Sequence, residues 1–235
     1  MDNVTEMNGM FANCKNLSSF PDISGWNIGK VVTLSNLFYN CGLVEKLPDI
    51  SKWNTENVND MSFIFSDCIS LLYLPDLSKW NIQNVNNINF MFNNCSKILK
   101  LPDISNWSFK NITIILGLFS GCSSLLYLPD LSKWINNEFN SNIKIHNIFF
   151  NCSSLSSIPD ISKWNIIVVN KNQNNEIFYN CKSLTSLSGI SKWKIDENIS
   201  INKIFYNCLS LAYLPDIIKK DTLLINNNCI SLLNP

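Results

Sequence analysis

The chain has 235 residues, of which 46% are hydrophobic and 15% are charged. This apolar content is enough to bury a sizeable core and excludes an intrinsically disordered chain. Lys and Arg number 18, as do Asp and Glu, so the formal net charge is zero and nothing steers the protein toward nucleic acid or an anionic membrane. The sequence contains no apolar run of about 18 residues or more, so no membrane span is expected.

A repeat with a period of about 27 residues runs through the sequence and is the signature of a repeat architecture. Its most regular member is a Cys, present as Cys14, Cys41, Cys68, Cys95, Cys122, Cys152, Cys181 and Cys208. Each of the first seven is followed by a Trp at a constant distance, as Cys68 is by Trp80. All variation in length falls between a Trp and the next Cys. The repeat predicts a solenoid in which each coil buries its apolar face against its neighbours.

The half of each repeat that precedes the Cys has a helical pattern. In the third copy the apolar residues at offsets 0, 3, 6, 7 and 10 are Val58, Met61, Ile64, Phe65 and Cys68. Because these offsets place the side chains on one helical face, the pattern predicts one short helix or helical turn per coil.

The half that follows the Cys is short and apolar and contains Pro. In the same copy Leu71 and Leu74 precede Pro75-Asp76, and since Pro excludes a helix interior, we expect a short strand or extended segment. The sequence therefore predicts an α/β repeat solenoid, with one extended segment and one short helix in each of about eight coils. We expect residues 1–235 to form a single such domain, with incomplete coils at both ends.

The consensus FxxCxSLxxLPDISKWNxxNVxxMxxMF resembles the repeat of BspA-like leucine-rich repeat surface proteins, in the variety shared with mycoplasma lipoproteins of unknown function. The resemblance covers essentially all of residues 1–235. It implies a leucine-rich-repeat solenoid with a helical convex side and a role in surface adhesion or protein recognition.

The repeated Cys, Asp and Trp residues each allow a chemical and a structural interpretation. The Cys residues lack the short pair spacing of a zinc site, and we expect a buried ladder of free thiols, with disulfides between coils as the alternative. The Asp residues suit turns that accept backbone hydrogen bonds, with a cation-binding stripe as the alternative: Asp22, Asp49, Asp76, Asp103, Asp130, Asp160 and Asp216. Each Trp is expected to pack a corner of its coil, with an aromatic binding stripe as the alternative. Asn residues that precede Cys, such as Asn40 and Asn94, are expected to form a hydrogen-bonded ladder.

No catalytic constellation is evident. The only histidine, His146, has no accompanying nucleophile motif, and we expect it to lie in a loop or on a helix surface. Phosphate-binding glycine loops are also absent from the sequence. The sequence therefore predicts no enzymatic activity, no metal site and no cofactor.

Two residues between the repeated leucines of each extended segment vary among the copies. Variable positions on a constant frame are typical of the binding surfaces of repeat proteins, although sequence drift at unconstrained positions would give the same pattern. The residues that we predict to contact a protein partner are Lys46, Leu72, Tyr73, Lys100, Leu126, Tyr127 and Tyr213.

The sequence thus predicts a non-enzymatic module that binds a protein of unknown identity, with surface recognition or adhesion preferred and an intracellular scaffold or substrate-recognition arm as the alternative. The resemblance favours the cell surface, whereas the absence of a signal peptide in MDNVTEMNGMF favours an intracellular location if Met1 is the true start. Neither end has a polar capping repeat, so end-to-end self-association through the terminal coils is also expected.

Overall fold

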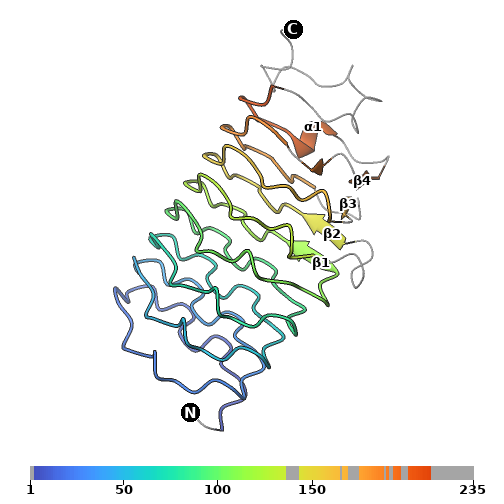
Figure 1. Cartoon of the computed structure of the whole chain (residues 1–235). Coiled ribbons are helices and arrows are strands. Elements are labelled where there is room, and N and C mark those ends of the chain that lie inside the picture. Colours follow the sequence, from blue (N-terminus) through green and yellow to red (C-terminus); the bar gives the residue numbers. More distant parts are fainter. Residues whose placement is uncertain are drawn as a thin grey trace.

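The computed structural model shows the described part of the chain as a stack of similar coils that follow one another in sequence order (Figure 1). It describes residues 3–135, 143–164, 166–168, 175–187, 189–190, 193–196 and 201–212. We number the coils 1 to 8 by their repeated Cys and end each coil at its Trp. One cluster of buried side chains extends from Met7 to Leu211 through the stack, so the described coils share a single continuous core.

The strands of the structure lie in the half of the coil that precedes the Cys. They are β1 (Ile114–Leu116), β2 (Ile143–His146), β3 (Ile166–Val168) and β4 (Lys194–Ile195), which pair in that order in a parallel sheet. Strands β1, β2, β3 and β4 belong to coils 5, 6, 7 and 8, respectively. In register, Ile115 of β1 lies beside Ile145 of β2, and Ile143 of β2 beside Ile166 of β3.

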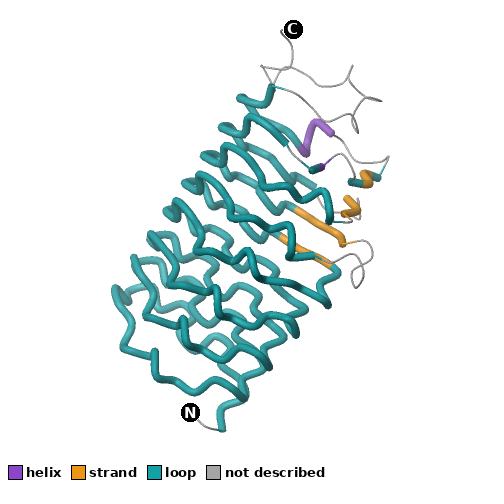
Figure 2. The backbone as a smooth tube through the Cα atoms, in the orientation of Figure 1, coloured by secondary structure: helices purple, strands orange, loops and turns teal. Residues whose placement is uncertain are grey.

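The prediction of a helix in every coil is wrong for the coils that the structure describes. Their one α-helix is α1 (Ile201–Ile204), in coil 8, and Figure 2 shows the other coils mostly as turns and loops. The predicted extended segment after the Cys is present as single parallel bridges between neighbouring coils, such as Lys46 with Tyr73 and Lys100 with Tyr127. The extended half is thus where it was expected, whereas the helical half is built from turns and short strands.

Left-handed backbone conformations interrupt the half that was predicted to be helical. Positive φ angles recur five residues before the Cys and again at the residue before it, as at Asn36 and Asn40, both with φ of 58°. Gly, Asn and Asp adopt this conformation at the lowest cost, and they occupy most of these positions. Phe63 and Phe90 take it with φ of 56°. A right-handed helix cannot continue through two such residues in so short a segment.

The amide groups of this segment alternate between two kinds of partner. In coil 2, alternate amides donate to carbonyls of coil 3 at 2.8 to 3.0 Å: Leu34 to Asp60, Asn36 to Ser62, Phe38 to Ile64 and Asn40 to Ser66. The amides between them close tight turns within the coil, as from Leu37 to Leu34. Because every second amide needs the next coil as its acceptor, the segment is stable only in the stack.

Stacked phenylalanines form the centre of the core. The Phe three residues before each Cys stacks on its counterpart in the next coil, with ring centroids 5.5 to 6.0 Å apart. The column consists of Phe11, Phe38, Phe65, Phe92, Phe119, Phe149, Phe178 and Phe205. Offset aromatic pairs at this distance add to the free energy of simple burial.

The eight repeated cysteines are free thiols, and all except Cys14 are buried. From Cys41 to Cys208, each Sγ donates to the carbonyl oxygen of the Phe in the preceding coil at 3.0 to 3.2 Å. Burial raises the pKa of the Cys41 thiol to about 11 and that of Cys68 to about 12, so these thiols stay protonated and unreactive at neutral pH. The expected ladder of buried thiols agrees with this arrangement.

Five of the seven tryptophans pack inside the stack and use the indole N–H to bind the coil before them, whereas the buried indole N–H of Trp193 has no such bond. Trp53 Nε1 donates to the carbonyl oxygen of Ile23 at 3.2 Å, and Trp80, Trp107, Trp134 and Trp164 repeat the bond at 2.9 to 3.2 Å. These five indoles are at most 3% exposed. They are therefore structural, as the corner-packing interpretation predicted, and offer no aromatic stripe to a ligand.

The aspartates of the Pro-Asp turns accept hydrogen bonds from their own turns. Asp22, Asp49, Asp76, Asp103, Asp130 and Asp160 each accept from the Ser amide two residues later, at 2.8 to 3.0 Å. For Asp76, the hydrogen bonds from the Ser78 amide and hydroxyl hold the pKa of the carboxyl below its usual value. The turn interpretation is confirmed at these six positions, and Asp216 lies outside the described residues.

The expected ladder of asparagines is present beside the Cys column. Asn40 Nδ2 donates to Oδ1 of Asn13 at 2.8 Å, and Asn207 Nδ2 donates to Oδ1 of Asn180 at 2.6 Å. In coil 4 Asn94 donates instead to Asp67 at 2.7 Å. These bonds satisfy side chains that the left-handed backbone turns toward the neighbouring coil.

The prediction for His146 is wrong. It lies on β2 and is only 8% exposed, because the lengthened segment of coil 6 forms a strand that turns this side chain into the stack. Burial, with a smaller contribution from the charge of Lys144, lowers the pKa of the imidazole. His146 is therefore a neutral residue of the coil interior at physiological pH.

Candidate protein-binding surface

The predicted contact residues that the structure describes are all exposed. Leu72 and Tyr73 are 42% and 54% exposed, Leu126 and Tyr127 are 44% and 50% exposed, and Lys46 and Lys100 are exposed as well. Tyr213 lies outside the described residues. The leucines on either side of each variable pair point inward, since Leu71 is fully buried and Leu74 is 7% exposed.

These exposed residues occupy the same positions of successive coils and so form two columns, which backbone pairing joins between coils 2 and 3 and between coils 4 and 5. The amide of Leu72 donates to the carbonyl of Glu45 at 3.0 Å, and that of Leu126 donates to Leu99 at 3.0 Å. One column contains Leu72, Leu99 and Leu126, and the other contains Lys46, Tyr73, Lys100 and Tyr127. We call these seven residues the recognition strip, which crosses coils 2 to 5.

The recognition strip gathers much of the exposed apolar surface of the described residues. Leu99 is 54% exposed, and near the strip Leu43 and Ile69, which lie just after the Cys of their coils, are 55% and 50% exposed. In coil 2 the position of the Leu column is occupied by Glu45. Single exposed apolar residues are ordinary, whereas a contiguous group marks an interaction surface. The prediction omitted Leu43 and Ile69, although the residues after each Cys also vary among the copies.

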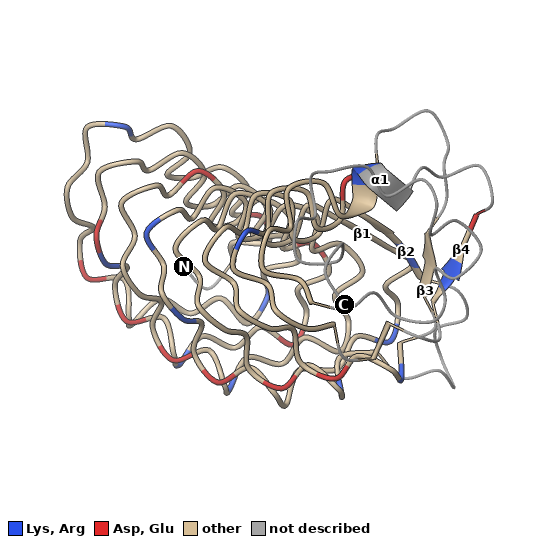
Figure 3. Ribbon diagram, turned by 90° about the horizontal axis from the view of Figure 1, so that it is seen from above, with Lys and Arg blue, Asp and Glu red and all other residues tan. Residues whose placement is uncertain are grey.

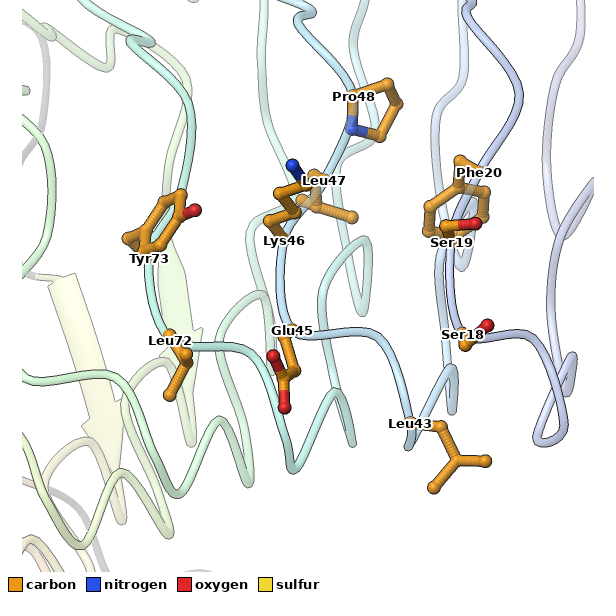
Figure 4. A pocket seen from close by; sticks show the side chains of 10 residues that line it. All are labelled: Ser18, Ser19, Phe20, Leu43, Glu45, Lys46, Leu47, Pro48, Leu72 and Tyr73. Atoms are coloured by element: carbon orange, nitrogen blue, oxygen red, sulfur yellow. The ribbon is translucent and has the colours of Figure 1, made fainter.

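A pocket of about 500 Å³ opens at the N-terminal end of the strip, across coils 1 to 3. Its lining residues are Ser18, Ser19, Phe20, Leu43, Glu45, Lys46, Leu47, Pro48, Leu72 and Tyr73. Figure 4 shows that they come from three coils lying side by side, with the Tyr73 hydroxyl on the side of the Lys46 coil. The pocket therefore combines apolar walls with hydroxyl groups and two opposite charges, which suits a side chain of a polypeptide.

The charges of the recognition strip have no partner within the described part of the chain. No hydrogen bond or ion pair engages the ammonium group of Lys46 or Lys100 or the carboxylate of Glu45 among those residues. Acidic and basic residues instead alternate along another edge of the stack (Figure 3). The strip thus carries ammonium groups that are available to a ligand.

Nothing in the described residues supports a metal centre or a membrane span. Within residues 3–135 and the shorter described segments that follow, no group of three or more His, Cys, Asp or Glu is placed to hold a metal ion. In the same part of the chain, no helix has the length and apolar character needed to cross a membrane. Chemistry at the recognition strip is therefore limited to what its Leu, Lys and Tyr side chains provide.

Comparison with known proteins identifies the repeat. The model of the family described as "Mycoplasma protein of unknown function, DUF285" matches residues 5–134 and again residues 97–216. The chain belongs to this family. The match confirms the BspA-like leucine-rich repeat of the mycoplasma type, and no curated protein is a significant match to the chain.

One solved structure supports the same architecture. The chain is similar to the leucine-rich repeat protein of T. pallidum, with 17% identity over 84% of this chain and 78% of that one and a TM-score of 0.50. It is also matched to a leucine-rich cell surface protein of Faecalibacterium prausnitzii, with 16% identity, coverage of 79% and 64%, and a TM-score of 0.25. The first likeness supports a leucine-rich-repeat fold for this DUF285 chain, while the second is too distant in shape to add to it.

Proposed function

We propose that this protein is a non-enzymatic recognition module at the cell surface, and that residues 1–235 act as one solenoid. The observation that carries the proposal is the recognition strip, in which exposed Leu and Tyr side chains lie on consecutive coils of a rigid frame. Tyr provides a large contact area and a polar tip at a small cost in conformational entropy, and it is enriched in binding hot spots.

The protein partner itself can be sought with a peptide library. Phage-displayed peptides are selected on the wild-type protein and then tested against the double variant Tyr73→Ala/Tyr127→Ala. We expect the selected peptides to lose at least about tenfold in affinity, since truncation of two central tyrosines commonly costs more than about 1 kcal/mol.

The matched control is Met10→Ala/Val32→Ala, which removes side chains that are 45% and 37% exposed in the other half of coils 1 and 2. We expect this variant to bind the selected peptides like the wild type. Equal binding by the wild type and the tyrosine variant, with both folded by circular dichroism, would refute the proposed surface.

A further inference from the structure

The Leu column of the recognition strip is a continuous apolar ridge. Leu72, Leu99 and Leu126 occupy the same position in coils 3, 4 and 5 and are 42%, 54% and 44% exposed. Neighbouring paired segments are about 4.8 Å apart, so the three side chains lie next to one another along the stack axis. A partner that covers this ridge must present apolar side chains at a similar interval.

The second column alternates basic and aromatic residues. The backbone of Lys46 pairs with that of Tyr73, and the backbone of Lys100 pairs with that of Tyr127. Each Lys therefore has a Tyr beside it on the next coil. An ammonium group and a hydroxyl together bind a carboxylate well, because both donate hydrogen bonds and one is charged. The column thus offers two carboxylate-binding pairs beside the Leu ridge.

The other charged residues near the strip do not remove its preference for carboxylates. Glu45 lies at the N-terminal end of the strip, and the next acidic residues are the aspartates of the Pro-Asp turns, three residues beyond the Lys/Tyr column. Those aspartates are already hydrogen-bonded within their turns, and Lys52, Lys79 and Lys133 follow three of them. The positive charge nearest the Leu ridge therefore comes from Lys46 and Lys100, together with Lys97, which is exposed and lies two residues before Leu99.

The spacing of the ridge fits an α-helix better than an extended strand. A helix that lies along the stack axis presents side chains of one face at intervals of about 5.4 Å, which is close to the interval of about 4.8 Å between coils. A strand in that direction presents one face at intervals of about 6.6 Å, twice its rise per residue. Over three or four coils the helix stays in register with the leucines, whereas the strand does not.

We propose that the recognition strip binds an acidic amphipathic helix that lies along the stack axis, with its apolar face on Leu72, Leu99 and Leu126 and its carboxylates at the two Lys/Tyr pairs. This inference rests on the proposed function, because it names the chemical class of the partner for the same surface. The pocket of coils 1 to 3 then receives a large side chain from one end of the helix.

The test uses a synthetic peptide labelled with fluorescein, of about 16 residues, which as a helix spans about 24 Å and so covers the whole ridge. Its Leu residues follow an i, i+3, i+4, i+7 pattern, and Glu residues line one side of the apolar face. We expect binding by fluorescence anisotropy that weakens as salt is raised, and a loss of about tenfold or more for Lys46→Glu/Lys100→Glu, which replaces two attractions by repulsions. The charge-matched control, Lys79→Glu/Lys133→Glu, lies on the Pro-Asp edge and is expected to change the affinity less than about twofold.

Two further peptides separate the contributions of charge and apolar face. A peptide with Lys in place of Glu is expected to bind the wild type poorly and to bind Lys46→Glu/Lys100→Glu better. A peptide that keeps the Glu residues but carries Ser in place of Leu is expected not to bind. Equal binding of the acidic and basic peptides, or binding by the Ser peptide, would overturn the proposal.

The peptide library distinguishes failure of this inference from failure of the proposed function. If the selected peptides depend on Tyr73 and Tyr127 but lack acidic residues, or bind as extended segments by circular dichroism, the surface stands and the acidic helix is wrong. If no selected or designed peptide depends on these tyrosines, both proposals are wrong.

Discussion

Coils 2 to 5 and coils 6 to 7 have the same frame but different exposed faces. The bridge from Lys46 to Tyr73 has its counterpart between Ser157 and Ser186, and the amide of Thr185 donates to Ser156 at 3.0 Å as Leu72 does to Glu45. In coils 6 and 7, however, the exposed pairs are Ser156-Ser157 and Thr185-Ser186. The buried columns therefore determine the fold of the coil, whereas the exposed pair can change without altering it.

The largest effect on stability is expected when a phenylalanine ring is removed from the core that the two regions share. Phe92 and Phe149 are at most 1% exposed in coils 4 and 6, and we expect Phe92→Ala and Phe149→Ala each to lower the free energy of unfolding by about 3–5 kcal/mol. Chemical denaturation measures the loss. A much smaller loss in coil 6 than in coil 4 would show that the two regions do not share one frame.

A smaller effect is expected at the left-handed position of coil 5. Gly121 has φ of 77°, and a Cβ there would lie 2.1 Å from Oδ1 of Asn94, so Gly121→Ala should lower the free energy of unfolding by about 1–3 kcal/mol. Gly121→Asn should lose less, because its amide can donate to Asn94 as Asn207 donates to Asn180. The control is Gly25→Ala, whose new Cβ meets nothing within 4 Å and should change stability by less than about 0.5 kcal/mol. Equal losses of stability at Gly121 and Gly25 would contradict the structural role of the left-handed residue that precedes the Cys.

The smallest effect on stability is expected when the exposed face is transferred. Ser156→Leu/Ser157→Tyr gives coil 6 the pair found in coils 3 and 5, and because both sites are exposed, the free energy of unfolding should change by about 0.5 kcal/mol or less. The variant should bind the acidic helical peptide more tightly than the wild type does. Unchanged affinity together with unchanged stability would show that the Leu column does not extend the binding surface.

The sequence predicted the stack, its buried columns and the exposed pair because these follow from spacing alone. The prediction failed for the segment before the Cys. There the offsets of Val58, Met61 and Ile64 fit a helix, but the backbone alternates between turns and hydrogen bonds to the next coil. The signal against a helix was the Asn or Gly at positions such as Asn36 and Gly117, whose positive φ ends any regular helix. The burial of His146 could not be foreseen, since it depends on strand β2, which pairs with the strands of the neighbouring coils.

The hydrogen bonds of the Trp and Cys side chains point in one direction along the stack. The indole of Trp53 and the thiol of Cys41 both donate to carbonyl oxygens of coil 1, and the same bonds recur from coil to coil as far as Trp164 and Cys208. Backbone amides of the same segment donate in the opposite direction, from each coil to the next. A coil added during synthesis therefore supplies the acceptors that the previous coil lacks and finds there the acceptors for its own Trp and Cys side chains.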